Sequence, residues 1–243
     1  MALTDSLIAH WKMEEDGTAS RVDSHGSYDL PYYTGGPGRV AGKFNYAVAF
    51  DDGASQYYLR TASSPGEAFY PSTGYTIAAW VYRGNDWQQS PAGYGSLFWL
   101  QGTYLPFEIY TLYSSGYVHR FRHQISTSSY IYVEVASALQ AWEFVVGRWN
   151  GSTVSISVNN GTPDTDTAAT LVAYADAVVT DLRCGRRYPS DEVYYVDSMS
   201  FWHRALSDAE VTTLYNSGDG LDYPFTESSK IGKTSPYPMF YRD

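Results

Sequence analysis

Short segments in which apolar and polar residues alternate recur along the chain, separated by clusters of Gly, Pro, Asn and Ser. In the segment 130–136, for example, Tyr130, Tyr132 and Glu134 alternate with three aliphatic residues. A period of two is typical of a half-buried β-strand, whose successive side chains point to opposite faces. Further segments of this kind are 6–13, 46–50, 57–61, 75–83, 96–102, 106–113, 116–124, 142–149 and 153–158. Many short strands without an intervening linker predict an all-β fold, an antiparallel β-sandwich of two sheets.

The clearest hairpin is predicted over residues 142–161, where two β-rich segments flank Asn150-Gly151. A tight two-residue turn needs a positive φ at both central positions, and Asn-Gly tolerates this conformation best. We therefore expect both residues to adopt it.

One short C-terminal helix is predicted near 207–217. Ser207 and Glu210 have the spacing of a capping box, in which each side chain accepts a hydrogen bond from the backbone N–H of the other residue. Gly218 is expected to end the helix in the left-handed conformation. Because a helix this short is marginal in isolation, we expect it to pack on the sandwich.

The strand before the helix, YYVDSMSFW, contains one carboxylate. Regular alternation places Asp197 on the same face as Met199 and Phe201. Burying an unpaired charge costs a large amount of free energy, so Asp197 is expected to have a partner.

The composition limits the partners that the chain can take. Aromatic residues make up 17% of the chain, which suits β-structure, and the formal net charge is −10. A chain with this much negative charge repels the phosphate backbone of nucleic acids. Nucleic acid is therefore not an expected partner. No segment of 18 apolar residues occurs, which argues against membrane insertion. The single Cys184 excludes an internal disulfide and is expected to be a buried hydrophobic residue.

Three parts of the sequence carry a resemblance to a known family. The N-terminal part reads IAHWKMEEDG, VDSHGSYDL and AGKFNYAVAF, the middle is the hairpin WEFVVGRWNGSTVSISVNNG, and the end is VDSMSFWHRALSDAEVTTLYNSGDGLDYPF. In this order they resemble laminin-G-like, concanavalin A-like jelly-roll domains over residues 6–225. The resemblance implies a jelly roll over 1–225. Residues 226–243 hold two prolines and little periodicity, so they are expected to form an extended tail. The resemblance also implies a binding or adhesion role, as in components of phage virions and surface proteins.

The N-terminus lacks the basic and apolar regions of a secretory signal peptide. We therefore expect a virion component, or a protein that reaches an extracellular surface by another route. The partner would be a glycan, another virion or surface protein, or both, and a homo-oligomer is a further option. A purely structural accessory protein that docks on capsid or tail subunits is the alternative.

Catalysis is tested by a search for paired carboxylates, because the same superfold includes β-glucanases. Retaining hydrolysis needs two carboxyl groups about 5 Å apart. Glu108 and Glu134 each occur alone in their predicted strands, whereas Asp164 and Asp166 are two apart but lie in a predicted loop. We therefore expect no enzymatic activity and keep a glycoside hydrolase as the third alternative.

The resemblance also implies one structural calcium ion, held between the Asp-Ser-x-Gly loop and the last core strand. The matching residues are Asp23 and Asp197, and Ca²⁺ takes six to eight oxygen ligands. The alternative is that Asp23 caps a turn while Asp197 binds backbone amides or an arginine.

Glycan binding is the preferred function because aromatic and cationic residues gather between residues 87 and 134. Glycans are held by aromatic faces together with hydrogen-bonding side chains. On the predicted strand 116–124, Arg120 and Arg122 lie on one face. The candidate ligand-binding residues are Trp87, Tyr94, Arg120, Arg122, Tyr130, Tyr132 and Glu134. The alternative is that these tyrosines simply cover a broad sheet.

Overall fold

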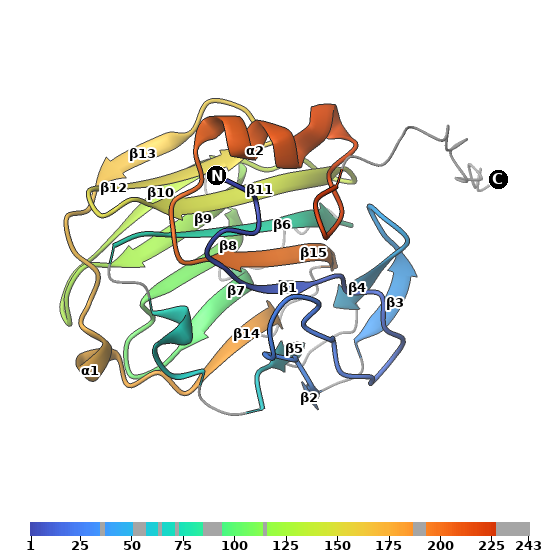
Figure 1. The fold of residues 1–243 in the computed structure, drawn as a ribbon, viewed down its shortest axis with the longest axis horizontal. Helices are drawn as coiled ribbons and strands as arrows, with labels where there is room; N and C mark the ends of the chain where they lie inside the picture. Colours follow the sequence, from blue (N-terminus) through green and yellow to red (C-terminus); the bar gives the residue numbers. More distant parts are fainter. Residues whose placement is uncertain are drawn as a thin grey trace.

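The structure is a computed structural model in which two antiparallel sheets stack as a sandwich, with one helix across its outer side (Figure 1). It describes residues 1–34, 37–50, 57–62, 65–70, 73–84, 94–113, 116–186 and 193–226. The predicted all-β jelly-roll fold is confirmed, whereas Trp87 and nearly all of the predicted tail lie outside the described residues.

The first sheet has eight strands, and β15 is at its centre. In spatial order they are β13 (Asp164–Thr167), β12 (Thr153–Val158), β11 (Trp142–Trp149), β6 (Tyr75–Arg83), β15 (Tyr194–Trp202), β4 (Tyr46–Phe50) and β3 (Gly38–Ala41), and β1 (Leu7–Trp11) pairs with the second half of β15. Along its other edge β15 pairs first with β4 and then with β1, which ties the N-terminal strand to the strand before the helix.

The second sheet has seven strands. In spatial order they are β10 (Tyr130–Ala136), β9 (Tyr117–Gln124), β8 (Phe107–Tyr113), β7 (Tyr94–Gln101), β14 (Asp181–Arg186), β5 (Tyr57–Arg60) and β2 (Tyr32–Thr34). Aromatic and aliphatic side chains from both sheets fill the space between them. Among these side chains are Tyr75, Phe98, Phe107, Phe121, Trp149 and Phe201. Cys184 is buried in the same core, as predicted.

A buried polar pair joins the two sheets near one end of the sandwich. The ring Nε2 of His119, on β9, lies 2.9 Å from the Oε2 of Glu143, on β11, and its Nδ1 lies 3.1 Å from the hydroxyl of Thr111. Burial acts to raise the pKa of Glu143, but the bond to His119 and the bonds from Ser137 and Ala138 hold it below its usual value.

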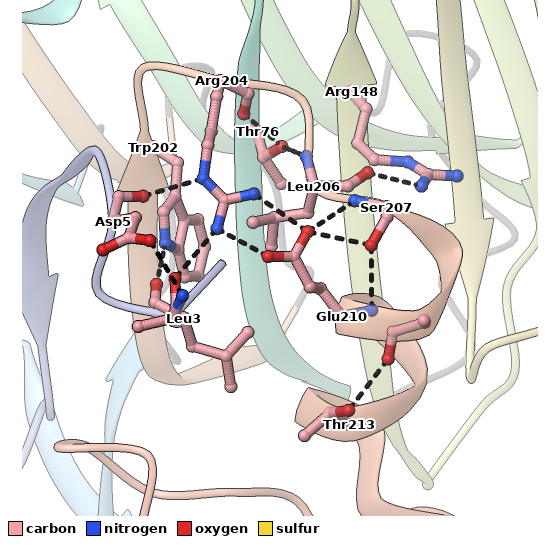
Figure 2. Close-up of polar contacts among 12 residues, drawn as sticks. Leu3, Asp5, Thr76, Arg148, Trp202, Arg204, Leu206, Ser207, Glu210 and Thr213 are labelled. Carbon is pink, nitrogen blue, oxygen red and sulfur yellow. Dashed lines mark hydrogen bonds and ion pairs between the residues drawn. The ribbon is translucent and has the colours of Figure 1, made fainter.

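The predicted helix is α2 (Asp208–Tyr215), and its capping box is present (Figure 2). The Glu210 backbone N–H donates to the Ser207 hydroxyl, and the Ser207 backbone N–H donates to the Glu210 carboxylate at 2.8 Å. The prediction for the helix end was wrong. Asn216, with φ 47°, already takes the left-handed position at the C-cap, and Gly218 belongs to the short 3₁₀ turn η2 (Asn216–Gly218) that follows.

Arg204 links the start of α2 to the N-terminal residues through hydrogen bonds (Figure 2). Its guanidinium donates to both carboxylate oxygens of Glu210, at 2.7 and 2.9 Å, and to the backbone carbonyls of Asp5 and Ala2. Nearby, the indole N–H of Trp202 donates to the carbonyl of Leu3 at 2.7 Å. Residues about 200 positions apart in the chain are thereby linked beside α2.

The alternation predicted for β15 was wrong at its middle. Ser198 has a φ of 49°, and the pairing of β15 with β6 shifts register between Asp197 and Ser200. This bulge moves every later side chain to the opposite face. Val196, Met199 and Phe201 therefore point into the core between the sheets. Asp197 lies opposite Trp80 of β6 on the other face of the sheet, where Trp80 packs under α2.

Two further predictions of local structure were wrong. The hairpin turn spans Asn150–Ser152, and only Gly151 has a positive φ there, since the Asn150 side chain instead accepts from the backbone N–H groups of Ser152 and Thr153. Asp164 and Asp166 lie in the edge strand β13, not in a loop.

The remaining helices are short, α1 (Tyr174–Ala177) and the 3₁₀ turn η1 (Gly66–Phe69). Among the described residues, no helix is long and apolar enough to cross a membrane.

Candidate functional site

The candidate site lies on the outer face of the seven-stranded sheet, over β9 and β10. Phe121 and His123 of β9 point inward and are buried, so Arg120 and Arg122 point outward, as the alternation predicts. In the antiparallel register Arg120 lies opposite Glu134, and Arg122 lies opposite Tyr132. The predicted residues of both strands therefore share one face.

Arg120 is fully engaged by its neighbours on this face. Its Nη2 and Nε lie 2.6 and 2.9 Å from the same carboxylate oxygen of Glu134. Its guanidinium also lies 4.1 Å from the ring centroid of Tyr132 and 6.0 Å from that of Tyr110. A guanidinium over an aromatic face is attracted by the ring quadrupole, which keeps both side chains in place.

Arg122 has fewer partners than Arg120. Its guanidinium lies 4.1 Å from the ring centroid of Tyr130, and its Nη2 donates to the Oε1 of Gln124 at 2.9 Å. Its Nε is buried and has no hydrogen-bond partner. Tyr130 and Tyr132 are 52% and 48% exposed, so a ligand can reach them.

A groove of about 330 Å³ opens beside Arg122. Its walls come from the strand ends and from two loops, one after β7 and one between β9 and β10. The lining residues are Thr103, Tyr104, Leu105, Arg122, Gln124, Thr127, Ser128 and Tyr130. Hydroxyl and amide groups beside tyrosine rings can bind and orient a polar molecule with an apolar face.

Both loops are held by backbone hydrogen bonds. Thr103 N–H donates to the carbonyl of Ala177 at 2.7 Å, which anchors the loop after β7 to the last residue of α1. In the other loop, Ile125 and Ser126 both donate to the carbonyl of Ser129, and the Gln124 side chain donates to the carbonyl of Ser126. The groove therefore has walls fixed before any ligand binds.

Five of the seven predicted ligand-binding residues come together on this face. They are Arg120, Arg122, Tyr130, Tyr132 and Glu134. Trp87 lies outside the described residues, and Tyr94 is placed in β7 without a described side chain. The prediction missed the groove residues from the two loops. Gln124 could have been found, because it continues the outward alternation of Arg120 and Arg122, and the run STSS over 126–129 follows it.

The carboxylates near this face are occupied. Glu108 is buried opposite Arg122 in the register of β8 and β9, and accepts a hydrogen bond from the Ser96 hydroxyl. Glu134 pairs with Arg120. Asp164, whose strand was mispredicted, accepts the backbone N–H of Glu134 at 2.9 Å and so ties β13 to β10 across the edge of the sandwich. Asp166 accepts the backbone N–H of Thr167.

The loop around Asp23 does not fit a calcium ion. The Asp23 carboxylate accepts four backbone N–H groups, those of His10, His25, Gly26 and Tyr28, at 2.9–3.0 Å. These donors point their hydrogens at both oxygens, where a cation would be repelled. Asp23 therefore caps its turn, which is the alternative stated above.

Asp197 is buried and accepts the backbone N–H of Phe44 at 2.9 Å through Oδ2, while Oδ1 has no hydrogen-bond partner. Burial raises the pKa of Asp197 to about 8, and the charges of Glu14 and Asp222 act in the same direction. Within the described ranges, no three His, Cys, Asp or Glu side chains converge to hold a metal. The calcium ion stays a prediction without a fitting set of ligands.

The fold is a jelly-roll sandwich of the kind found in lectins and glucanases. The chain belongs to the concanavalin A-like lectin/glucanases superfamily, whose laminin-G-type family model matches residues 51–212. No protein of curated function matches the sequence.

Several solved structures share the fold. The binding domain of Paraclostridial Mosquitocidal Protein 1 is 15% identical with a TM-score of 0.68, over 89% of this chain and 53% of that one. The binding domain of botulinum neurotoxin DC in complex with SialylT is 14% identical with a TM-score of 0.66, over 88% and 52%. The same toxin domain in complex with rat synaptotagmin II is 14% identical with a TM-score of 0.65, over 88% of this chain and 52% of that one. The chain spans about half the length of these domains, and at such identities the likeness shows the fold alone.

Proposed function

We propose that the protein is a non-catalytic glycan-binding module whose ligand lies on the outer face of β9 and β10. The observation that carries the proposal is the pair of Arg–Tyr contacts, Arg120 with Tyr132 and Arg122 with Tyr130, beside an open groove of about 330 Å³. The rings supply flat apolar surfaces for the faces of sugar rings, while neighbouring polar groups bind hydroxyls.

The relatives of the fold support a binding role. One similar toxin domain, that of botulinum neurotoxin DC, has been solved both in complex with SialylT and in complex with rat synaptotagmin II, so a jelly roll of this kind occurs in a protein that binds a glycan and a protein receptor. A non-catalytic role is supported by the carboxylates of the site, since Glu134 pairs with Arg120 and Glu108 with Ser96. That the module serves on a phage particle or a cell surface, or docks on other subunits of one, stays a prediction.

A glycan array followed by titration calorimetry tests the proposal. The double variant Tyr130→Ala/Tyr132→Ala is expected to lower the affinity for the best glycan at least about tenfold, which corresponds to about 1.4 kcal/mol. The matched control is Tyr46→Ala, because Tyr46 is a similarly exposed tyrosine on the other sheet with Arg39 at 4.1 Å from its ring centroid. Unchanged binding in the double variant, or no binding of the native protein to any glycan, would overturn the proposal.

A further inference from the structure

We infer that the groove beside Arg122 takes the carboxylate of an acidic sugar, so that the ligand is an anionic glycan. This inference rests on the proposed function and names the class of its ligand. It depends on the difference between the two arginines of the face and on the charge of the groove.

The two arginines differ in whether the protein itself neutralises them. Arg120 makes a two-point contact with the carboxylate of Glu134. Arg122 makes no ion pair with any described residue, and among those residues it donates a hydrogen bond to the neutral amide of Gln124. Its Nε is buried without an acceptor, and leaving a buried donor unsatisfied destabilises a protein. The Arg122 guanidinium is therefore short of acceptors in the described structure.

Arg122 gives the groove its positive charge. Of the described residues that line it, Arg122 is the only charged one, and the others are Thr103, Tyr104, Leu105, Gln124, Thr127, Ser128 and Tyr130. Glu108, the nearest carboxylate in the strand register, is buried, binds Ser96 and does not line the groove. A chain with a net charge of −10 thus presents a local cationic site at this groove.

The chemistry of a guanidinium favours a carboxylate here. Its planar N–H groups match the two oxygens of a carboxylate, and such charge-assisted bonds are about twice as strong as neutral ones. The uncharged hydroxyls of Thr127 and Ser128 suit the hydroxyl groups of the same sugar. The Tyr130 ring, already packed against the guanidinium, can carry the apolar face of the sugar ring.

The test compares matched pairs of glycans in titration calorimetry. The probes are oligosaccharides that end in sialic, glucuronic or galacturonic acid, each beside the same oligosaccharide with the carboxyl group reduced to an alcohol. The native protein is expected to bind at least one acid at least about tenfold more tightly than its reduced partner, because one charge-assisted contact is lost. Arg122→Gln is expected to abolish this preference, and Arg122→Lys to retain part of it.

Arg39→Gln is the matched control, since it removes a guanidinium that also packs 4.1 Å from a tyrosine ring centroid, that of Tyr46, but on the other sheet and away from the groove. It is expected to keep the preference for the acid. Thermal unfolding of each variant checks that it is folded. Equal affinity for every acid and its reduced partner overturns the inference, as does a preference that survives Arg122→Gln. If reduced glycans bind equally well and Tyr130→Ala/Tyr132→Ala abolishes their binding, the proposed function stands and this inference fails. If no glycan binds, both fail.

Discussion

The eight-stranded sheet covers its outer face with α2, whereas the seven-stranded sheet leaves β9 and β10 open. Under α2, Val211 and Leu214 pack against aromatic residues of the sheet such as Trp80, Phe144 and Trp202. On β10, Tyr130 and Tyr132 are about half exposed and contact arginines. Outward side chains of the eight-stranded sheet thus pack against a helix, whereas those of β9 and β10 remain accessible to solvent.

The difference follows from the residues that alternate outward. On β6 and β11 the outward positions include Trp80, Phe144 and Val146, and such a surface must be covered because apolar area in contact with water costs free energy. On β9 and β10 the outward positions include two arginines, two tyrosines and a glutamate, whose polar groups are stable in water. The first face therefore needs the helix, and the second is free to take a ligand.

The largest effect is expected from breaking the packing under α2. Leu214 is 4% exposed, and Leu214→Ala is expected to destabilise the protein by about 2–5 kcal/mol, since it leaves a cavity. Urea denaturation measures the change. The control is Thr213→Ala, an exposed position of the same helix, with an expected change below about 0.5 kcal/mol. A small effect of Leu214→Ala would mean that the helix is not needed to cover this face.

A smaller, pH-dependent effect is expected at the cap of α2. The hydrogen bond from Arg204, and also those from Ser207, lower the pKa of Glu210 from 4.5 to about 2. Because the folded pKa is depressed, this stabilisation is fully present above pH 4.5 and is lost as the pH falls towards 2. In Glu210→Gln the amide can keep the capping hydrogen bond but has no charge, so this part of the pH dependence is expected to disappear.

Denaturation at several pH values between 7 and 2 checks this prediction. At neutral pH the free energy of unfolding of Glu210→Gln is expected to be about 1 kcal/mol lower than that of the native protein. Asp208→Asn is the matched control, because Asp208 is an acidic residue in the same helical turn whose side chain is 88% exposed. Parallel pH profiles for the native protein and Glu210→Gln would contradict the role given to the Arg204–Glu210 pair.

The smallest effect on stability is expected on the open face. Glu134→Gln removes the carboxylate that neutralises Arg120, and a partly exposed ion pair of this kind contributes about 0–1 kcal/mol. The freed guanidinium is expected to raise the affinity for an acidic glycan by a factor of about two to five. Titration calorimetry measures it, and a lower affinity would show that Glu134 itself binds the ligand.

Where the sequence predicted structure correctly, the signal was local. The faces of β9 and β10 follow directly from period-two alternation, and the start of α2 follows from Ser207 and Glu210 alone. The prediction for β15 failed because a bulge at Ser198 depends on pairing with β6, which the sequence of one strand does not encode. Likewise β13 has no apolar residues and exists because β12 offers it an edge.

The candidate site was predictable in part for the same reason. Its strand residues alternate regularly, but the groove forms where the loop of Tyr104 meets the loop of Ser128, and nothing in the intervening sequence links the two. Asp23 shows what a family motif leaves out. Its place in the motif suggested a metal, and only the structure shows that its carboxylate accepts four backbone N–H groups.

The location of the ligand is tested most directly by backbone NMR during titration of the isotope-labelled protein with its best array glycan. Shifts are expected to concentrate at β9, β10 and the two loops of the groove, 102–105 and 125–129, with α2 and the strands beneath it unchanged. Shifts concentrated at α2 and the eight-stranded sheet, with β9 and β10 unaffected, would contradict the account.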